Sequence, residues 1–203
     1  MSCNSGAAKA QAEGLIKKYF DPEKLEAKGR LQFFYHSPSS AFPVRDVRDE
    51  QGHGYKTEPH LERNAENYRA ECYQKTNIQG LLKCREEYLF LFTTCRSRVS
   101  QMDKFYGERY IVGYIRVERF LPRQGFIAVQ GETRIVSFKD AYPLEGLNAS
   151  KKNRHIRVRR LSVEETKRVL NHLRRFKNVK GRCIGEIRRL EMGLRRKEIG
   201  KCS

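Results

Sequence analysis

Tryptophan is absent from this chain of 203 residues, and so is any long apolar run. The longest apolar segments, Leu89 to Phe92 and Tyr110 to Ile115, have the length of strands and fall far short of a bilayer span, which excludes a membrane protein. The first residues, Met1 to Lys9, lack the apolar core of a secretory signal. Export is therefore not expected, and we predict a cytoplasmic protein with no membrane partner.

The six cysteines lack any recognisable pattern. No two form a C-x-x-C pair and no histidine stands at a zinc-finger offset, so the zinc templates fail. Without export, disulfides are not expected either, and Cys72, Cys84 and Cys95 are interpreted as buried thiols. A metal held by these three together with a histidine stays open, but the spacing does not support it. We predict no metal site and no cofactor.

Acidic residues are too few to balance the basic ones. Asp and Glu number 24 against 42 Lys and Arg, which gives a formal net charge of +18. Residues 151–203 contain 19 Lys and Arg but only five Glu, so most of these cations have no partner of opposite charge nearby in the sequence. A basic block of this kind is typical of proteins that bind phosphate backbones. The alternative is a solvated, ion-paired surface.

Hydrophobic patterns predict an α+β fold. Helical spacing predicts helices over 7–20, about 61–72 and 183–197, and apolar runs predict strands over 31–36, 88–94, 110–117, 126–129, 134–138 and 155–159. The strand over 88–94 is nearly continuously apolar and is expected to be central. Gly113 indicates a bulge or a close backbone approach. Residues 37–59 are polar and are expected to form an open loop.

The clearest helix start is Ser162-Val-Glu-Glu165, a capping box in which hydroxyl and carboxylate satisfy reciprocal backbone amides. It predicts a helix over 162–175 that packs on the sheet. We expect an N-terminal helical extension over 1–30, one domain over 31–176 and a basic C-terminal helix over 177–203.

Four segments share their order with a known superfamily. They are Tyr-Leu-Phe-Leu-Phe-Thr-Thr (88–94), Tyr-Ile-Val-Gly-Tyr-Ile-Arg-Val (110–117), Arg-Ile-Val-Ser-Phe-Lys-Asp-Ala-Tyr-Pro-Leu (134–144) and Leu-Ser-Val-Glu-Glu-Thr-Lys-Arg-Val-Leu (161–170). Over about residues 31–173 the chain resembles the PUA-like superfamily and, within it, the YTH and EVE domains. The resemblance implies a curved mixed sheet or open barrel flanked by helices, with an extruded base held at one end. YTH domains grip a methylated base with tryptophans, which this chain lacks.

The resemblance places base-reading groups just after the first strand, on the following helix and in the loop before the closing strand. These positions correspond to His36 and Ser37, Asn64 and Asn67, and Asn153 and Arg154. Amides and hydroxyls can donate and accept along a base edge, and an aromatic ring can stack on it. Without tryptophan, stacking is left to Phe34, Tyr35, Phe42 or Tyr55. Of these we favour Phe42 and Tyr55, because they lie in a polar stretch, whereas alternation makes either Phe34 or Tyr35 a core residue.

The basic block supplies the residues expected to hold the phosphate backbone. They are Lys151, Lys152, Arg157, Arg159, Lys167, Arg168, Arg174, Arg175, Arg188 and Arg189. The predicted partner is nucleic acid, either DNA or RNA, and the sequence predicts no oligomeric state.

Two other functions stay open beside a nucleic-acid-binding module without chemistry of its own. One is an enzyme acting on modified nucleotides or nucleic acid, with Cys95 as nucleophile and His36 as base. Arg96 and Arg98, which follow Cys95, would favour its thiolate. The other is a basic structural protein without a base pocket.

Overall fold

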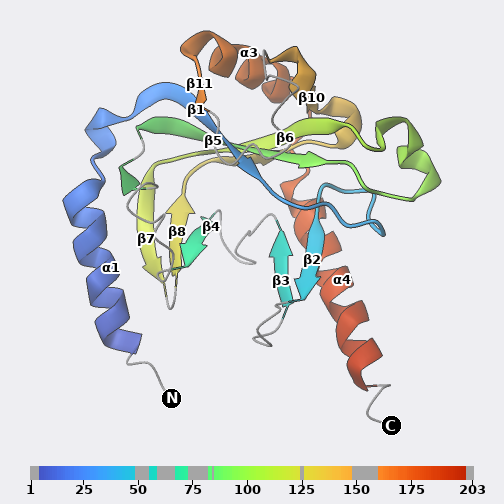
Figure 1. Cartoon of the computed structure of the whole chain (residues 1–203), viewed down its shortest axis with the longest axis horizontal. Helices are drawn as coiled ribbons and strands as arrows, with labels where there is room; N and C mark the ends of the chain where they lie inside the picture. The colour runs from blue at the N-terminus through green and yellow to red at the C-terminus, as the bar shows by residue number, and fades with distance from the viewer. Residues whose placement is uncertain are drawn as a thin grey trace.

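The computed structural model of the chain describes residues 5–48, 55–58, 67–72, 82–83, 85–123, 126–147 and 160–199. Its largest unit is a mixed six-stranded sheet in the order β10-β6-β5-β1-β11, with β9 as a further partner of β6 (Figure 1). The strands are β1 (Glu26–Phe33), β5 (Glu86–Thr94), β6 (Arg109–Arg116), β9 (Thr133–Ile135), β10 (Tyr142–Pro143) and β11 (Arg160–Leu161). Only β1 and β5 pair in parallel. The described strands thus form an open sheet and not a closed barrel.

Four of the five strands predicted to share a sheet do so, as β1, β5, β6 and β9. The fifth, 155–159, lies outside the described residues. The predicted bounds were wrong for two strands. β1 covers Glu26–Phe33 and not 31–36, and β9 ends at Ile135, after which Phe138–Asp140 forms a 3-10 helix. The mixed α+β class is confirmed.

The central position predicted for 88–94 is also confirmed, since β5 lies between β1 and β6. Leu89, Phe90, Leu91 and Phe92 are all buried, because the sheet is covered on both faces at this point. The register of β5 against β6 shifts between Leu91 and Phe92, opposite Gly113. A Cβ at Gly113 would lie 2.2 Å from the Arg134 carbonyl oxygen of β9. Both the bulge and the close approach predicted there are present.

Three α-helices of the described residues surround this sheet: α1 (Ser5–Tyr19), α3 (Val163–Arg174) and α4 (Lys180–Ile199). Each matches a predicted helix, and the Ser162 capping box is complete, with Glu165 N–H donating to Ser162 Oγ at 3.1 Å and Ser162 N–H to Glu165 Oε2 at 3.0 Å. Figure 1 shows α3 above the sheet, with α1 and α4 extending below it at opposite ends. Ala12 of α1 and Cys183 and Ile187 of α4 belong to the same buried cluster as β5 and β6.

Two smaller sheets differ from what the sequence predicted. The helix predicted over about 61–72 is wrong for 67–72, which forms β4 (Asn67–Cys72) in a three-stranded antiparallel sheet with β8 (Phe126–Gln130) and β7 (Arg119–Arg123). Apolar Tyr68, Ala70 and Cys72 also fit a period of two, and pairing with β8 decides in favour of the strand. The open loop expected over 37–59 contains an antiparallel pair, β2 (Arg45–Arg48) and β3 (Tyr55–Glu58).

Among the described helices, none has the length and apolarity needed to cross a bilayer.

Candidate nucleic-acid interface

The loop after β1 contains three residues predicted for the base pocket, His36, Ser37 and Phe42. The His36 ring is buried, and its Nδ1 accepts the backbone N–H of Arg96 at 3.0 Å. Because Nδ1 accepts, the proton of the neutral ring lies on Nε2, which donates to the Phe42 carbonyl at 2.8 Å. Both ring nitrogens therefore hydrogen-bond to backbone groups of the protein and are not available to a ligand.

The protonation state of His36 follows from this environment. Burial lowers the pKa of His36 to about 4, against the smaller opposing effect of hydrogen bonds to the Phe42 and Ser40 backbone. The ring also contacts the Phe138 ring, with 4.8 Å between centroids. His36 is thus neutral near pH 7, and it neither adds charge for a phosphate nor offers an unused nitrogen as a base.

Ser40 and Phe42 connect this loop to α4. Ser37 is buried, and its hydroxyl lies 3.0 Å from that of Ser39. The Ser40 hydroxyl donates to Glu186 Oε1 of α4 at 3.0 Å, and the Arg182 guanidinium of α4 lies over the Phe42 ring, 5.0 Å from its centroid. The structure does bring His36, Ser37 and Phe42 together. His36 joins the loops that follow β1 and β5, and Phe42 contacts Arg182 of α4. Phe42, expected to have no core to fill, packs against the core.

Cys95 does not have the properties expected of a nucleophile. It is fully buried at the end of β5, and burial raises the pKa of its thiol, with a hydrogen bond to the Ser97 backbone acting the other way. Arg96 and Arg98 are exposed and do not overcome this effect. With a disfavoured thiolate and both His36 nitrogens engaged, the geometry does not support the Cys95–His36 pair.

The other predicted base-pocket residues are only partly described. Asn67 lies in β4 opposite Gln130 of β8, and Tyr55 lies in β3 opposite Arg48 of β2. Asn67 therefore does not share a helix face with Asn64 by an i, i+3 spacing. Asn64, Asn153 and Arg154 lie outside the described residues, as do the basic residues Lys151, Lys152, Arg157 and Arg159.

The predicted backbone-binding residues that the structure describes fall into two groups, one on α3 and one on α4. Lys167, Arg168 and Arg175, on α3 or at its C-terminal end, are exposed, and none has an ion pair with a carboxylate in the described part of the chain. Arg174 differs, since its Nε donates to the Tyr114 hydroxyl at 3.4 Å. On α4, Arg188 is exposed and Arg189 pairs with Glu186 at 2.7 Å. The two helices lie on opposite sides of the six-stranded sheet (Figure 1).

Asn178 sets the direction in which α4 leaves the sheet. Its Oδ1 accepts the Ile135 N–H at 3.1 Å, and its Nδ2 donates to the Thr133 carbonyl at 3.1 Å. The next residue, Val179, donates its N–H to the Ile135 carbonyl at 2.7 Å. The connection between α3 and α4 is thereby bound to β9, and the α4 cations have a defined position relative to the sheet.

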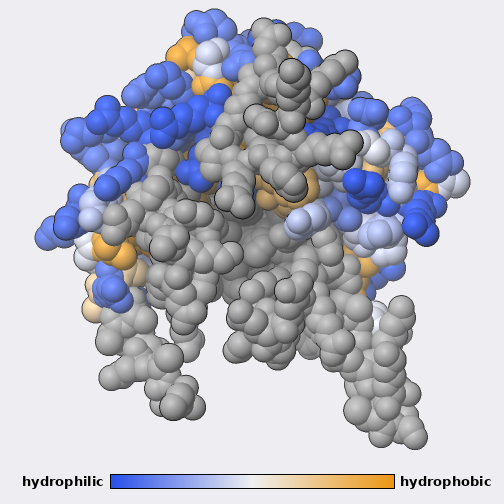
Figure 2. Space-filling view, viewed as in Figure 1, coloured by the Kyte–Doolittle hydropathy of each residue, from blue (hydrophilic) through white to orange (hydrophobic). Residues whose placement is uncertain are grey.

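Three exposed residues lie just beyond the ends of β1 and β5. The sequence analysis gave Tyr35 only as a less favoured stacking residue, and it did not propose Arg96 or Arg98 as binding residues. Tyr35 is 56% exposed, while its neighbour Phe34 is in the core. Arg96 and Arg98 follow β5, and the Arg98 N–H donates to the Pro38 carbonyl at 2.9 Å, which joins the two loops. The sequence places each of these residues just after an apolar run, but only the parallel pairing of β1 and β5 brings them to one edge of the sheet. Figure 2 shows that hydrophilic side chains dominate the described surface in this view.

The chain matches no protein-family model, no curated protein and no solved structure.

Proposed function

We propose that the protein binds nucleic acid and that its sheet is PUA-like, with the base-reading end where β1 and β5 end. The observation that carries the proposal is a group of exposed cations without a described carboxylate partner: Lys167, Arg168, Arg175 and Lys177. Contact with phosphates releases the counterions that such cations otherwise hold, which favours binding.

The excess of charge extends beyond these residues. Residues 160–199 contain 13 Lys and Arg but only five Glu. Two of those Glu are already engaged, since Glu186 accepts from Arg189 and Ser40, and Glu165 caps α3. A surface of this composition attracts polyanions over a range of about 8 Å at physiological ionic strength.

Support for base reading comes from the end of β1. Tyr35 is exposed, and its ring makes a T-shaped contact with the Phe33 ring, with 5.0 Å between ring centroids. A ring held in this way can stack on an unpaired base of any sequence. Arg96 and Arg98 on the adjoining loop would hold the phosphates on either side. The order of strands followed by the closing helix α3 supports the PUA-like assignment.

Charge reversal on one helix at a time tests the proposal. Lys167→Glu with Arg168→Glu on α3, and Arg182→Glu with Arg188→Glu on α4, change the net charge equally. Because α3 and α4 lie on opposite sides of the sheet, a short duplex touches only one of them. We expect one pair alone to weaken binding and to make the slope of log K against log salt shallower by about 0.9 for each phosphate that the variant no longer neutralises.

Fluorescence anisotropy over a series of salt concentrations measures both quantities, and thermal unfolding verifies that each variant is folded. The decrease in affinity should be the same for duplexes of unrelated sequence, because phosphate contacts position the partner without reading it. If neither pair changes affinity or slope, the proposal is wrong.

A second prediction concerns Tyr35. Tyr35→Ala should weaken binding to a single-stranded oligonucleotide by about 1–3 kcal/mol, the contribution of one base–aromatic stack. Tyr35→Phe keeps the ring and should bind nearly as well as the unmodified protein. The salt slope should be unchanged in both variants, since no charge is removed. Equal binding by the alanine and phenylalanine variants would rule out stacking on this ring.

A further inference from the structure

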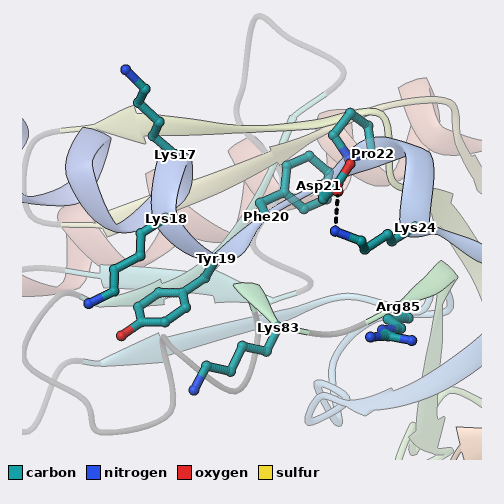
Figure 3. A pocket seen from close by; sticks show the side chains of 9 residues that line it. All are labelled: Lys17, Lys18, Tyr19, Phe20, Asp21, Pro22, Lys24, Lys83 and Arg85. Atoms are coloured by element: carbon teal, nitrogen blue, oxygen red, sulfur yellow. Dashed lines mark ion pairs between the residues drawn. The ribbon is translucent and has the colours of Figure 1, made fainter.

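A cationic pocket of about 580 Å³ lies beside the edge at which β1 and β5 begin (Figure 3). It is lined by Lys17, Lys18, Tyr19, Phe20, Asp21, Pro22, Lys24, Lys83 and Arg85. The pocket results from the parallel pairing of these two strands. Glu26 lies opposite Glu86, so the segments that precede β1 and β5 meet at one edge although they are some 60 residues apart in the chain. The volume is that of a small-molecule site.

The walls of this pocket are held in place by the protein itself. The Phe20 ring meets the Phe120 ring of β7 edge to face, with 4.7 Å between centroids. The Asp21 carboxylate accepts the Glu23 N–H at 3.1 Å, which caps the 3-10 helix over Pro22–Lys24. On the other side, the Arg85 carbonyl accepts the Glu26 N–H at 2.6 Å. The backbone and the Phe20 wall of the pocket are therefore formed in advance, so a ligand has only the cationic side chains to order.

Positive charge in the pocket exceeds negative charge. Asp21 is the single carboxylate among the lining residues, and it pairs with Lys24 at 2.7 Å. The hydrogen bond from Lys24, followed by that from the Glu23 backbone, lowers the pKa of Asp21, so this pair stays ionised. Figure 3 shows Lys17 pointing away from the other cations. Three cations then remain for a ligand: Lys18, Lys83 and Arg85.

Two of these cations, Lys18 and Lys83, lie beside the same tyrosine ring, and Figure 3 shows Arg85 apart from them. The Lys18 and Lys83 ammonium groups lie 5.2 and 4.7 Å from the centre of the same Tyr19 ring, so they are separated by no more than the sum of these distances. Neither they nor Arg85 have an ion pair with any residue that the structure describes. Like charges on neighbouring exposed side chains repel, and an anion bound beside Lys18 and Lys83 relieves that repulsion.

We propose that this pocket binds the phosphate group of a phosphate ester, carried either by a free nucleotide or by the 5′ end of a nucleic-acid strand. A phosphomonoester carries about two negative charges at pH 7, which matches the cations available. Lysine and arginine are the side chains that usually bind phosphate. Phe20 and Pro22 leave an apolar wall for the organic part. This site lies apart from the α3 and α4 cations and does not depend on the proposed function.

Isothermal titration with inorganic tripolyphosphate tests the pocket directly. Lys18→Gln with Lys83→Gln should weaken binding about tenfold or more, the effect expected when hydrogen bonds from charged groups are removed. The matched control is Lys9→Gln with Lys104→Gln, which removes the same charge outside the pocket. Lys104 also lies over an aromatic ring, Phe105, at 5.0 Å. The control should bind like the unmodified protein.

Two further arms identify the source of the phosphate. Uridine triphosphate is compared with uridine, and a 5′-phosphorylated oligonucleotide with its 5′-hydroxyl form, each with the pocket and control variants. A phosphate-dependent difference that the pocket variant abolishes supports the proposal and names the source. Absence of tripolyphosphate binding, or equal weakening by the pocket and control pairs, overturns it. Tripolyphosphate binding without oligonucleotide binding would contradict the proposed function while leaving the pocket intact.

Discussion

Replacing Gly131 with alanine is expected to destabilise the protein by at least about 3 kcal/mol, a large value for one added methyl group. Gly131 lies in the turn between β8 and β9. A Cβ at this position would be 1.6 Å from the Arg116 carbonyl oxygen. The obstacle is backbone and cannot rotate away. Arg116 N–H donates to the Glu132 carbonyl at 2.8 Å and Glu118 N–H to the Gln130 carbonyl at 2.9 Å, so separating the two segments breaks these bonds.

Urea unfolding measures this effect as a lower midpoint. Gly185→Ala is the matched control, since Gly185 lies within α4 and a Cβ there meets nothing within 4 Å. Alanine is the better helix former, so the control should be stabilised by roughly 0.5–1 kcal/mol. An unchanged midpoint for Gly131→Ala would show that the turn has room for a methyl group beside the Arg116 carbonyl, which would contradict this prediction.

The second large effect is a decrease of stability in acid caused by His36. Its pKa is about 4 in the folded protein and about 6.5 when unfolded. Between these values the unfolded chain binds the additional proton. The stability is therefore complete above pH 6.5 and falls as the pH decreases towards 4, by about 3 kcal/mol in total. A protonated ring would also place a second proton on Nδ1 against the Arg96 N–H.

Urea unfolding between pH 7 and 4 measures this change. His36→Asn is the comparison, because asparagine keeps one donor and one acceptor but does not titrate in this range. The unfolding free energy of the variant should depend less on pH, whatever its absolute stability. Carboxylates such as Glu186, whose pKa is lowered by its hydrogen bond to Arg189, titrate in both proteins and cancel in the difference. Parallel curves for the two proteins would contradict the buried, neutral ring.

The predicted base pocket shows that residue type alone does not determine whether a side chain is available to a ligand. His36 and Ser37 follow a strand and carry groups suited to a base edge, which is why the resemblance selected them. Whether those groups face a ligand depends on partners elsewhere in the chain. The Phe42 carbonyl is six residues away and the Arg96 amide is 60 residues away, and together they use both His36 nitrogens. Such an arrangement cannot be read from local sequence.

Much of the fold is determined by local sequence. The apolar run over 88–94 predicts a buried strand. The Ser162 capping box predicts a helix start, because the partners of its amides are three residues away. The basic composition likewise follows from the sequence. These features need no distant residue.

Tertiary structure alone decided the rest. The segment 67–72 fits both periods, and β8 makes it a strand. The basic C-terminal quarter reads as one block, yet α3 and α4 carry its described cations to opposite sides of the sheet (Figure 1). The pocket at Lys18, Lys83 and Arg85 exists only because β1 and β5 pair in parallel and bring two distant segments to one edge. The physical reason is the same in each case: helix caps and apolar periodicity act over a few residues, whereas pairing and packing join residues that the sequence separates.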